Sequence, residues 1–198
     1  EYIRDLGYTG IWLTPIFTSS SLHKYNASSY YEIDASFGTL EDFDKLILKA
    51  HALGIKVILD LAINHSSKNA SYFQKAVEAH KKKINFSSLN DEEKKYQDFY
   101  VFYDTEDQAK QSRKTYYKVP NCNFYYEANF DSDMTEFNFD NENVWQEFDN
   151  IMTFWQQKGV DGFRLDAVKY YYLNETNKNV TALSRIKQIA LRNDPKAY

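Results

Sequence analysis

The chain has 198 residues, of which 43% are hydrophobic, and this proportion is enough to form the core of a folded domain. Its 24 basic and 28 acidic residues are spread along the sequence and give a net charge of −4, which argues against nucleic acid or an anionic membrane as a partner. No apolar run approaches the roughly 18 residues of a membrane-spanning helix, so we expect no membrane segment.

The first third of the sequence predicts a strand, a helix and a second strand. Residues 9–16 form a short apolar run closed by a proline, which is typical of a strand that is buried on both faces of a parallel sheet. Residues 40–53 carry apolar side chains at helical spacing, with Thr39 as the N-cap and Gly54 as the stop. A second apolar run at 55–62 follows directly, and this order indicates a βαβ unit.

The same alternation returns in the last third of the sequence. Residues 144–159 predict a helix, residues 160–166 a third buried strand, and residues 180–191 a final helix. The stretch 66–143 is much longer than an ordinary βα connection, so we expect a subdomain there, with a helix near 72–83 and short strands. Three strands with alternating helices fit either a small doubly wound sheet or part of a barrel.

Polar residues follow the predicted strands, at the ends where parallel α/β proteins gather their reactive groups. Asp60, Asn64 and His65 come at the end of the second strand. Arg164 and Asp166 alternate at the end of the third strand, so their side chains point the same way. An arginine there lowers the pKa of the aspartate and keeps it ionised, as a nucleophile requires. The alternative is an ordinary ion pair at a strand end.

Five segments, in order along nearly the whole chain, resemble motifs of the α-amylase family of glycoside hydrolases. Residues 60–65 (DLAINH) and 162–169 (GFRLDAVK) resemble the motifs that end the third and fourth strands of the family's barrel. The resemblance implies an α/β fold, a partial TIM (β/α)₈ barrel of about strands two to four with a subdomain inserted after the third strand. The other matching segments are residues 10–16, residues 30–34 with 37–39, and residues 134–138.

The resemblance also implies a division of the chain. Residues 1–65 would be the first part of the catalytic barrel, residues 66–143 the inserted subdomain (domain B), and residues 144–198 the continuation of the barrel. A full barrel needs about 250 residues before any insertion. We therefore expect this chain to be a fragment that is inactive alone, with the family's general-acid glutamate outside it.

Specific roles follow from the resemblance for residues at the strand ends. Asp166 would be the nucleophile that forms a covalent glycosyl-enzyme, and Arg164 would hold and tune it. Tyr25 would stack on the sugar in the cleavage subsite, His65 would contact the same sugar, and Lys169 would bind glucose units on the leaving-group side.

Two further strand-end residues would support the site. Asp60 would brace it, and Asn64 would help to hold a calcium ion where the subdomain meets the barrel. Calcium is the one cofactor that the resemblance implies.

The function expected from this resemblance is retaining hydrolysis of α-1,4-glucosidic bonds in an α-glucan or a maltooligosaccharide. The alternatives are an α-glucosidase or transglycosylase of the same family, or a non-catalytic barrel ectodomain such as an amino-acid transporter heavy chain. Six Asn-x-Ser/Thr sequons favour a secreted or cell-surface location.

Overall fold

A three-stranded parallel sheet forms the centre of the protein. The computed structural model describes residues 1–198. The sheet has the order β1 (Gly10–Leu13), β2 (Lys56–Leu61) and β8 (Gly162–Leu165), and both pairings are parallel. All three strands therefore end at one edge of the sheet, and the three predicted strands are confirmed, each shorter than its apolar run.

Four helices flank the three strands in the sequence: α1 (Tyr2–Asp5), α2 (Leu40–Ala52), α6 (Glu142–Gln157) and α7 (Thr176–Asn193). Helix α2 begins as predicted, because the side chain of Thr39 accepts a hydrogen bond from Asp42 N and the Asp42 side chain accepts one from Thr39 N. It ends before Gly54, whose φ of +70° suits glycine. None of the helices is long and apolar enough to cross a lipid bilayer.

Helix α7 begins earlier than the sequence predicted. Its first turn, residues 176–179, is polar, so apolar periodicity did not mark it. Asn179 is buried there because its side chain bonds the preceding loop: its Oδ1 accepts from Tyr172 N (2.9 Å), and its Nδ2 donates to Tyr172 O (2.9 Å) and Lys169 O (3.2 Å).

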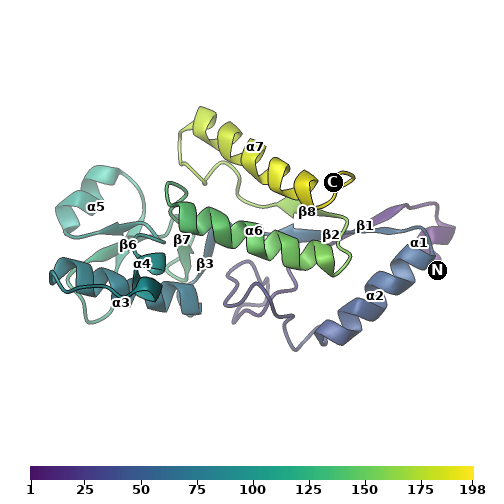
Figure 1. Cartoon of the computed structure of the whole chain (residues 1–198), viewed down its shortest axis with the longest axis horizontal. Coiled ribbons are helices and arrows are strands. Elements are labelled where there is room, and N and C mark those ends of the chain that lie inside the picture. Colours follow the sequence, from purple (N-terminus) through teal and green to yellow (C-terminus); the bar gives the residue numbers. More distant parts are fainter.

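The long segment between β2 and β8 folds into small sheets and helices at the end of the molecule opposite α1 and α2 (Figure 1). The predicted helix near 72–83 is confirmed as α3. The proposed division after residue 65 falls inside β3 (His65–Ser67), which pairs antiparallel with β7 (Met134–Glu136). Three further strands form a second antiparallel sheet in the order β4, β6, β5. The elements are β3 (His65–Ser67), α3 (Ser71–Ile84), α4 (Asp91–Tyr96), β4 (Phe102–Tyr103), α5 (Glu106–Ser112), β5 (Tyr116–Lys118), β6 (Tyr125–Glu127) and β7 (Met134–Glu136).

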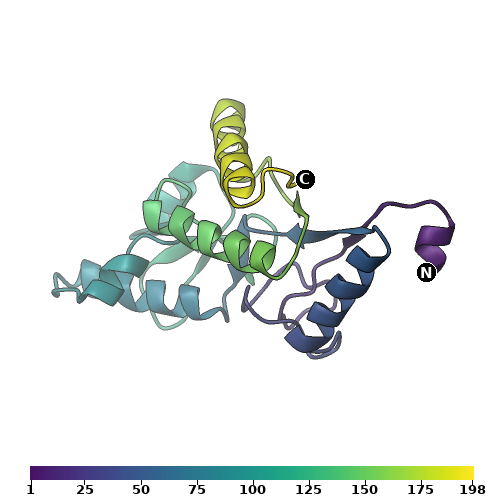
Figure 2. The same cartoon turned by 45° about the vertical axis from the view of Figure 1, so that its right-hand side comes forward.

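One continuous core joins this segment to the parallel sheet, and Figure 2 shows α6 lying between the two parts. Phe137, which follows β7, packs edge-on against Phe148 of α6 with ring centroids 5.4 Å apart. Trp155 of α6 is fully buried, and its indole N–H donates to Tyr30 O at 2.8 Å. The shared core means that the segment cannot shift without disturbing the sheet's helices.

Tyr198 lies along the edge of β8 that faces away from β2. Tyr198 N donates to Asp161 O (3.0 Å), and Phe163 N donates to Tyr198 O (3.1 Å). This approach requires glycine at position 162, because a Cβ there would lie 2.4 Å from Tyr198 O.

Glu147 of α6 is a buried polar anchor between the two parts. It accepts hydrogen bonds from the hydroxyls of Tyr31 and Tyr72, each at 2.9 Å, and it pairs with Lys95 of α4 at 3.2 Å. Tyr31 lies in the loop before α2, and Tyr72 lies in α3. One carboxylate therefore joins three separate parts of the chain.

We expect Glu147→Ala to lower the free energy of unfolding by about 3 kcal/mol, because buried hydroxyls and a lysine lose their acceptor. Urea unfolding measures the change. The matched control is Glu142→Ala on the same helix. Glu142 pairs with Arg185 but its side chain is 78% exposed, so we expect a change of less than about 1 kcal/mol. Equal effects of the two variants would contradict this account of Glu147.

Candidate active site

The ends of β2 and β8 bring three charged side chains together. The register pairs Asp60 with Arg164, and Asp166 follows two residues after Arg164. Arg164 Nη1 lies 3.0 Å from Asp60 Oδ2 and 2.5 Å from Asp166 Oδ1. The predicted common direction of Arg164 and Asp166 is confirmed, and the arginine also holds the carboxylate of the neighbouring strand.

The two carboxylates differ in their exposure to solvent. The Asp60 side chain is fully buried, whereas that of Asp166 is 25% exposed. Burial raises the pKa of Asp60, and the charge and hydrogen bonds of Arg164 oppose that rise. Asp166 is thus the carboxylate that an incoming ligand can reach, while the buried Asp60 holds Arg164 from the neighbouring strand.

Tyr25 and His65 lie beside this cluster. The Tyr25 hydroxyl donates to Asp60 Oδ2 at 3.3 Å. His65 is buried, and burial lowers its pKa to about 4 although the nearby charge of Asp166 favours protonation. The imidazole is therefore neutral at pH 7. The ring is buried beside the Tyr25 backbone, and its Nε2 has no partner among the protein's hydrogen bonds.

Asn64, the residue expected to help hold calcium, lies between β2 and β3. Its Nδ2 donates to Glu136 Oε2 at 2.5 Å, and its Oδ1 is buried without a partner. Burial raises the pKa of Glu136 to about 8. Calcium takes six to eight oxygen ligands, and no group of three His, Cys, Asp or Glu side chains here could hold a metal ion. Calcium binding by Asn64 stays a prediction from the resemblance.

Lys169 is not brought to the charged cluster. It lies in the turn after β8, is exposed, and its side chain makes no hydrogen bond or ion pair with other residues. Its backbone carbonyl accepts a hydrogen bond from Asn179 at the start of α7. Its leaving-group role therefore stays a prediction from the family motif.

Two aromatic residues at the site were missed by the sequence reasoning. The guanidinium of Arg164 lies over the Trp12 ring, 5.2 Å from its centroid. Phe130, 44% exposed, lies 5.4 Å from the His65 ring and 4.4 Å from that of Tyr170, measured between centroids. Trp12 lies three residues before Pro15 in the matched segment 10–16. The alternation of side chains along that strand was the signal that could have identified it. Nothing in the sequence separates Phe130 from the other aromatic residues of its segment.

The fold and the site together define a class: a parallel α/β enzyme scaffold in which an arginine holds a reachable carboxylate at the carboxyl edge of the sheet. The neutral histidine and the aromatic rings around that carboxylate fit a ligand with hydroxyl groups and flat faces.

Comparisons with known proteins agree with this class. The family model described as the alpha amylase catalytic domain matches residues 1–198. Alpha-amylase 3 of Dictyoglomus thermophilum is 42% identical over 180 residues, covering 91% of this chain and 33% of that protein. Maltase A1 of Drosophila melanogaster is 35% identical over 190 residues, covering 87% of this chain and 30% of that protein. The solved structure of Eubacterium rectale Amy13B superposes with a TM-score of 0.87 at 36% identity, covering 100% of this chain and 37% of that one.

The chain therefore belongs to the α-amylase family of glycoside hydrolases. It spans about a third of the length of the curated relatives that it matches.

Proposed function

We propose that the protein carrying this chain is a retaining hydrolase of α-1,4-glucosidic bonds in starch-like glucans or maltooligosaccharides. The observation that carries the proposal is the Asp166 carboxylate, which is held by Arg164 at a strand end and is reachable from solvent. The relatives named alpha-amylase and maltase support the substrate class.

In this proposal Asp166 attacks the anomeric carbon and forms a covalent ester with the sugar. Arg164 fixes the direction of the carboxylate. His65 contacts the same sugar, and Tyr25 offers its ring as a stacking face. Lys169 binds glucose units on the leaving-group side. The proton for the leaving oxygen comes from a carboxyl group outside these residues.

The proposal places the observed strands in a barrel. β1, β2 and β8 would be its second, third and fourth strands, and residues 66–143 would be the subdomain inserted after the third. The parallel order β1–β2–β8 and the Amy13B likeness support this assignment.

A second candidate within the family is an α-glucosidase or transglycosylase. The likeness to maltase A1 favours it. Such an enzyme would use the same Asp166 ester and differ in chain-length preference or in the group that attacks the ester.

Proton NMR of maltoheptaose digestion by the full-length protein that carries this chain tests the proposal. We expect the first product to carry the α-anomeric configuration, because two displacements retain configuration. We also expect internal cleavage to maltotriose and longer fragments. Release of glucose alone would favour the α-glucosidase, and longer products would favour transfer. A β-anomeric first product would contradict a retaining mechanism.

A further inference from the structure

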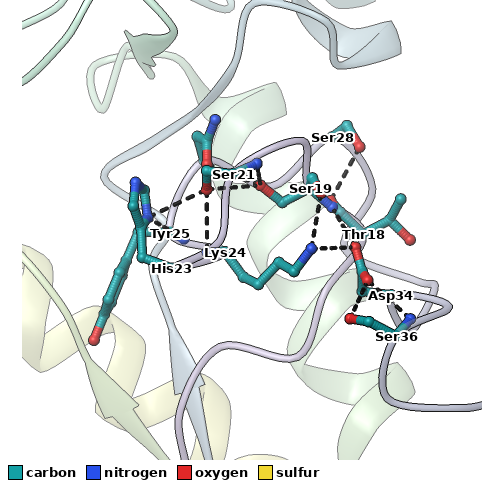
Figure 3. Close-up of polar contacts among 10 residues, drawn as sticks. Thr18, Ser19, Ser21, His23, Lys24, Tyr25, Ser28, Asp34 and Ser36 are labelled. Atoms are coloured by element: carbon teal, nitrogen blue, oxygen red, sulfur yellow. Dashed lines mark hydrogen bonds and ion pairs between the residues drawn. The ribbon is translucent and has the colours of Figure 1, made fainter.

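The loop between β1 and α2 carries Tyr25 to the site, and a buried ion pair holds it. Figure 3 shows the Lys24 side chain reaching back across the loop toward Asp34. Lys24 Nζ lies 2.7 Å from Asp34 Oδ2 and donates to Ser19 O at 3.1 Å. The two charged side chains are only 13% and 12% exposed, so water competes weakly for this contact.

Asp34 is fixed in turn by further donors. Ser36 donates to Asp34 Oδ1 from its backbone N (3.0 Å) and from its hydroxyl (2.6 Å), and Ser19 N donates to Oδ2 at 3.3 Å. The hydrogen bond from Lys24, followed by those from Ser36, holds the pKa of Asp34 well below its usual range. Asp34 is therefore a rigid, ionised anchor for the lysine.

The backbone of Lys24 has a conformation that glycine adopts more easily than lysine. Its φ of +62° lies in the left-handed region, where glycine fits without steric cost and a lysine is disfavoured by roughly 1 kcal/mol. The ion pair with Asp34 and the hydrogen bond from Lys24 N to Ser21 Oγ (3.1 Å) hold this conformation. The ammonium contacts of Lys24 are ones that glycine could not make at this position.

Tyr25 is the next residue after Lys24, so the conformation of Lys24 determines where the Tyr25 backbone lies. Tyr25 N donates to His23 Nδ1 at 3.1 Å, and the centroids of the two rings lie 5.9 Å apart. At the far end of the side chain, the Tyr25 hydroxyl reaches Asp60, the partner of Arg164. A chain of contacts thus runs from Asp34 through Lys24 and Tyr25 to the charged cluster.

We propose that Lys24 is a positioning residue for the glycosidase reaction: its ion pair with Asp34 fixes the turn that places Tyr25 against the bound sugar. The inference rests on the proposed function. Lys24 itself does not touch the reacting atoms and acts only through Tyr25.

A double-mutant cycle tests this inference. Lys24→Met is expected to reduce kcat/KM on maltoheptaose about tenfold, because the stacking face is displaced. The same change in a Tyr25→Ala background is expected to cost less than about twofold, because the positioned group is already gone. Lys24→Gly, which relieves the backbone strain but lacks the ammonium group, should lose as much as Lys24→Met.

The matched control is Lys158→Met, which removes the Lys158–Asp44 ion pair between α6 and α2. We expect its kcat/KM to stay at the wild-type value. Equal losses for Lys24→Met in both backgrounds, or full activity of Lys24→Gly, would overturn the inference while the proposed function stands. A full-length wild-type protein that cleaves no α-glucoside would overturn both.

Discussion

Asp166→Asn is expected to reduce kcat on maltoheptaose by on the order of 10⁴-fold or more, the largest effect of any single substitution in this chain. The amide has nearly the same shape as the carboxylate but cannot form the glycosyl ester. The substitution keeps a hydrogen-bonding group next to Arg164, so we expect the fold and the substrate affinity to change little. Stopped-flow or long-incubation assays of reducing ends measure the loss.

The control for this variant is Asp44→Asn in α2, where the carboxylate pairs with Lys158 at the end of α6. It should leave kcat unchanged. Azide added to Asp166→Ala should restore turnover by attacking the anomeric carbon from the vacated face, giving a β-glucosyl azide. An Asp166→Asn enzyme within tenfold of wild type would contradict the nucleophile assignment.

Arg164→Met is expected to reduce kcat by about 10²- to 10³-fold, the loss typical of removing a preorganised electrostatic contact. Methionine keeps the unbranched apolar stem of the side chain but leaves Asp60 and Asp166 adjacent without a shared cation. Because Arg164 opposes the rise in the Asp60 pKa, its loss leaves Asp60 protonated at higher pH. The acidic limb of the kcat profile should therefore move to higher pH.

The pH profile separates this role from a purely structural one. A variant that only destabilises the fold would lose activity at all pH values without a shifted limb. Arg164→Lys is expected to recover part of the rate, because one ammonium group neutralises charge but cannot bond both carboxylates as the guanidinium does. An Arg164→Met enzyme with wild-type rate and profile would contradict the role given to this arginine.

Local signals in the sequence were sufficient for the central βαβ unit. Apolar runs predicted β1 and β2, and the cap at Thr39 and the stop at Gly54 predicted both ends of α2. Helix α7 shows the limit of such signals: its polar first turn is held by the hydrogen bonds of Asn179, which are tertiary contacts that periodicity does not report.

The site was predictable where strand alternation governs it. Arg164 and Asp166 were expected on one side of β8, and they lie there. Their contact with Asp60 depends on the register between β2 and β8, which a single sequence does not specify. The approach of Phe130 to His65 depends on the packing of a long segment, and the sequence offered no signal for it.

The roles assigned to the strand-end residues rest on one bond, the ester between Asp166 and a sugar. A mechanism-based fluorosugar, 5-fluoro-α-D-glucosyl fluoride, traps this ester when the carboxylate displaces fluoride from the anomeric carbon. Trypsin cleaves after Arg164 and Lys169 and so isolates residues 165–169, in which Asp166 is the one carboxylic side chain. We predict that mass spectrometry will find the fluoroglucosyl group on this peptide. A label on another peptide, or none on an enzyme that turns over α-glucosides, would contradict the account.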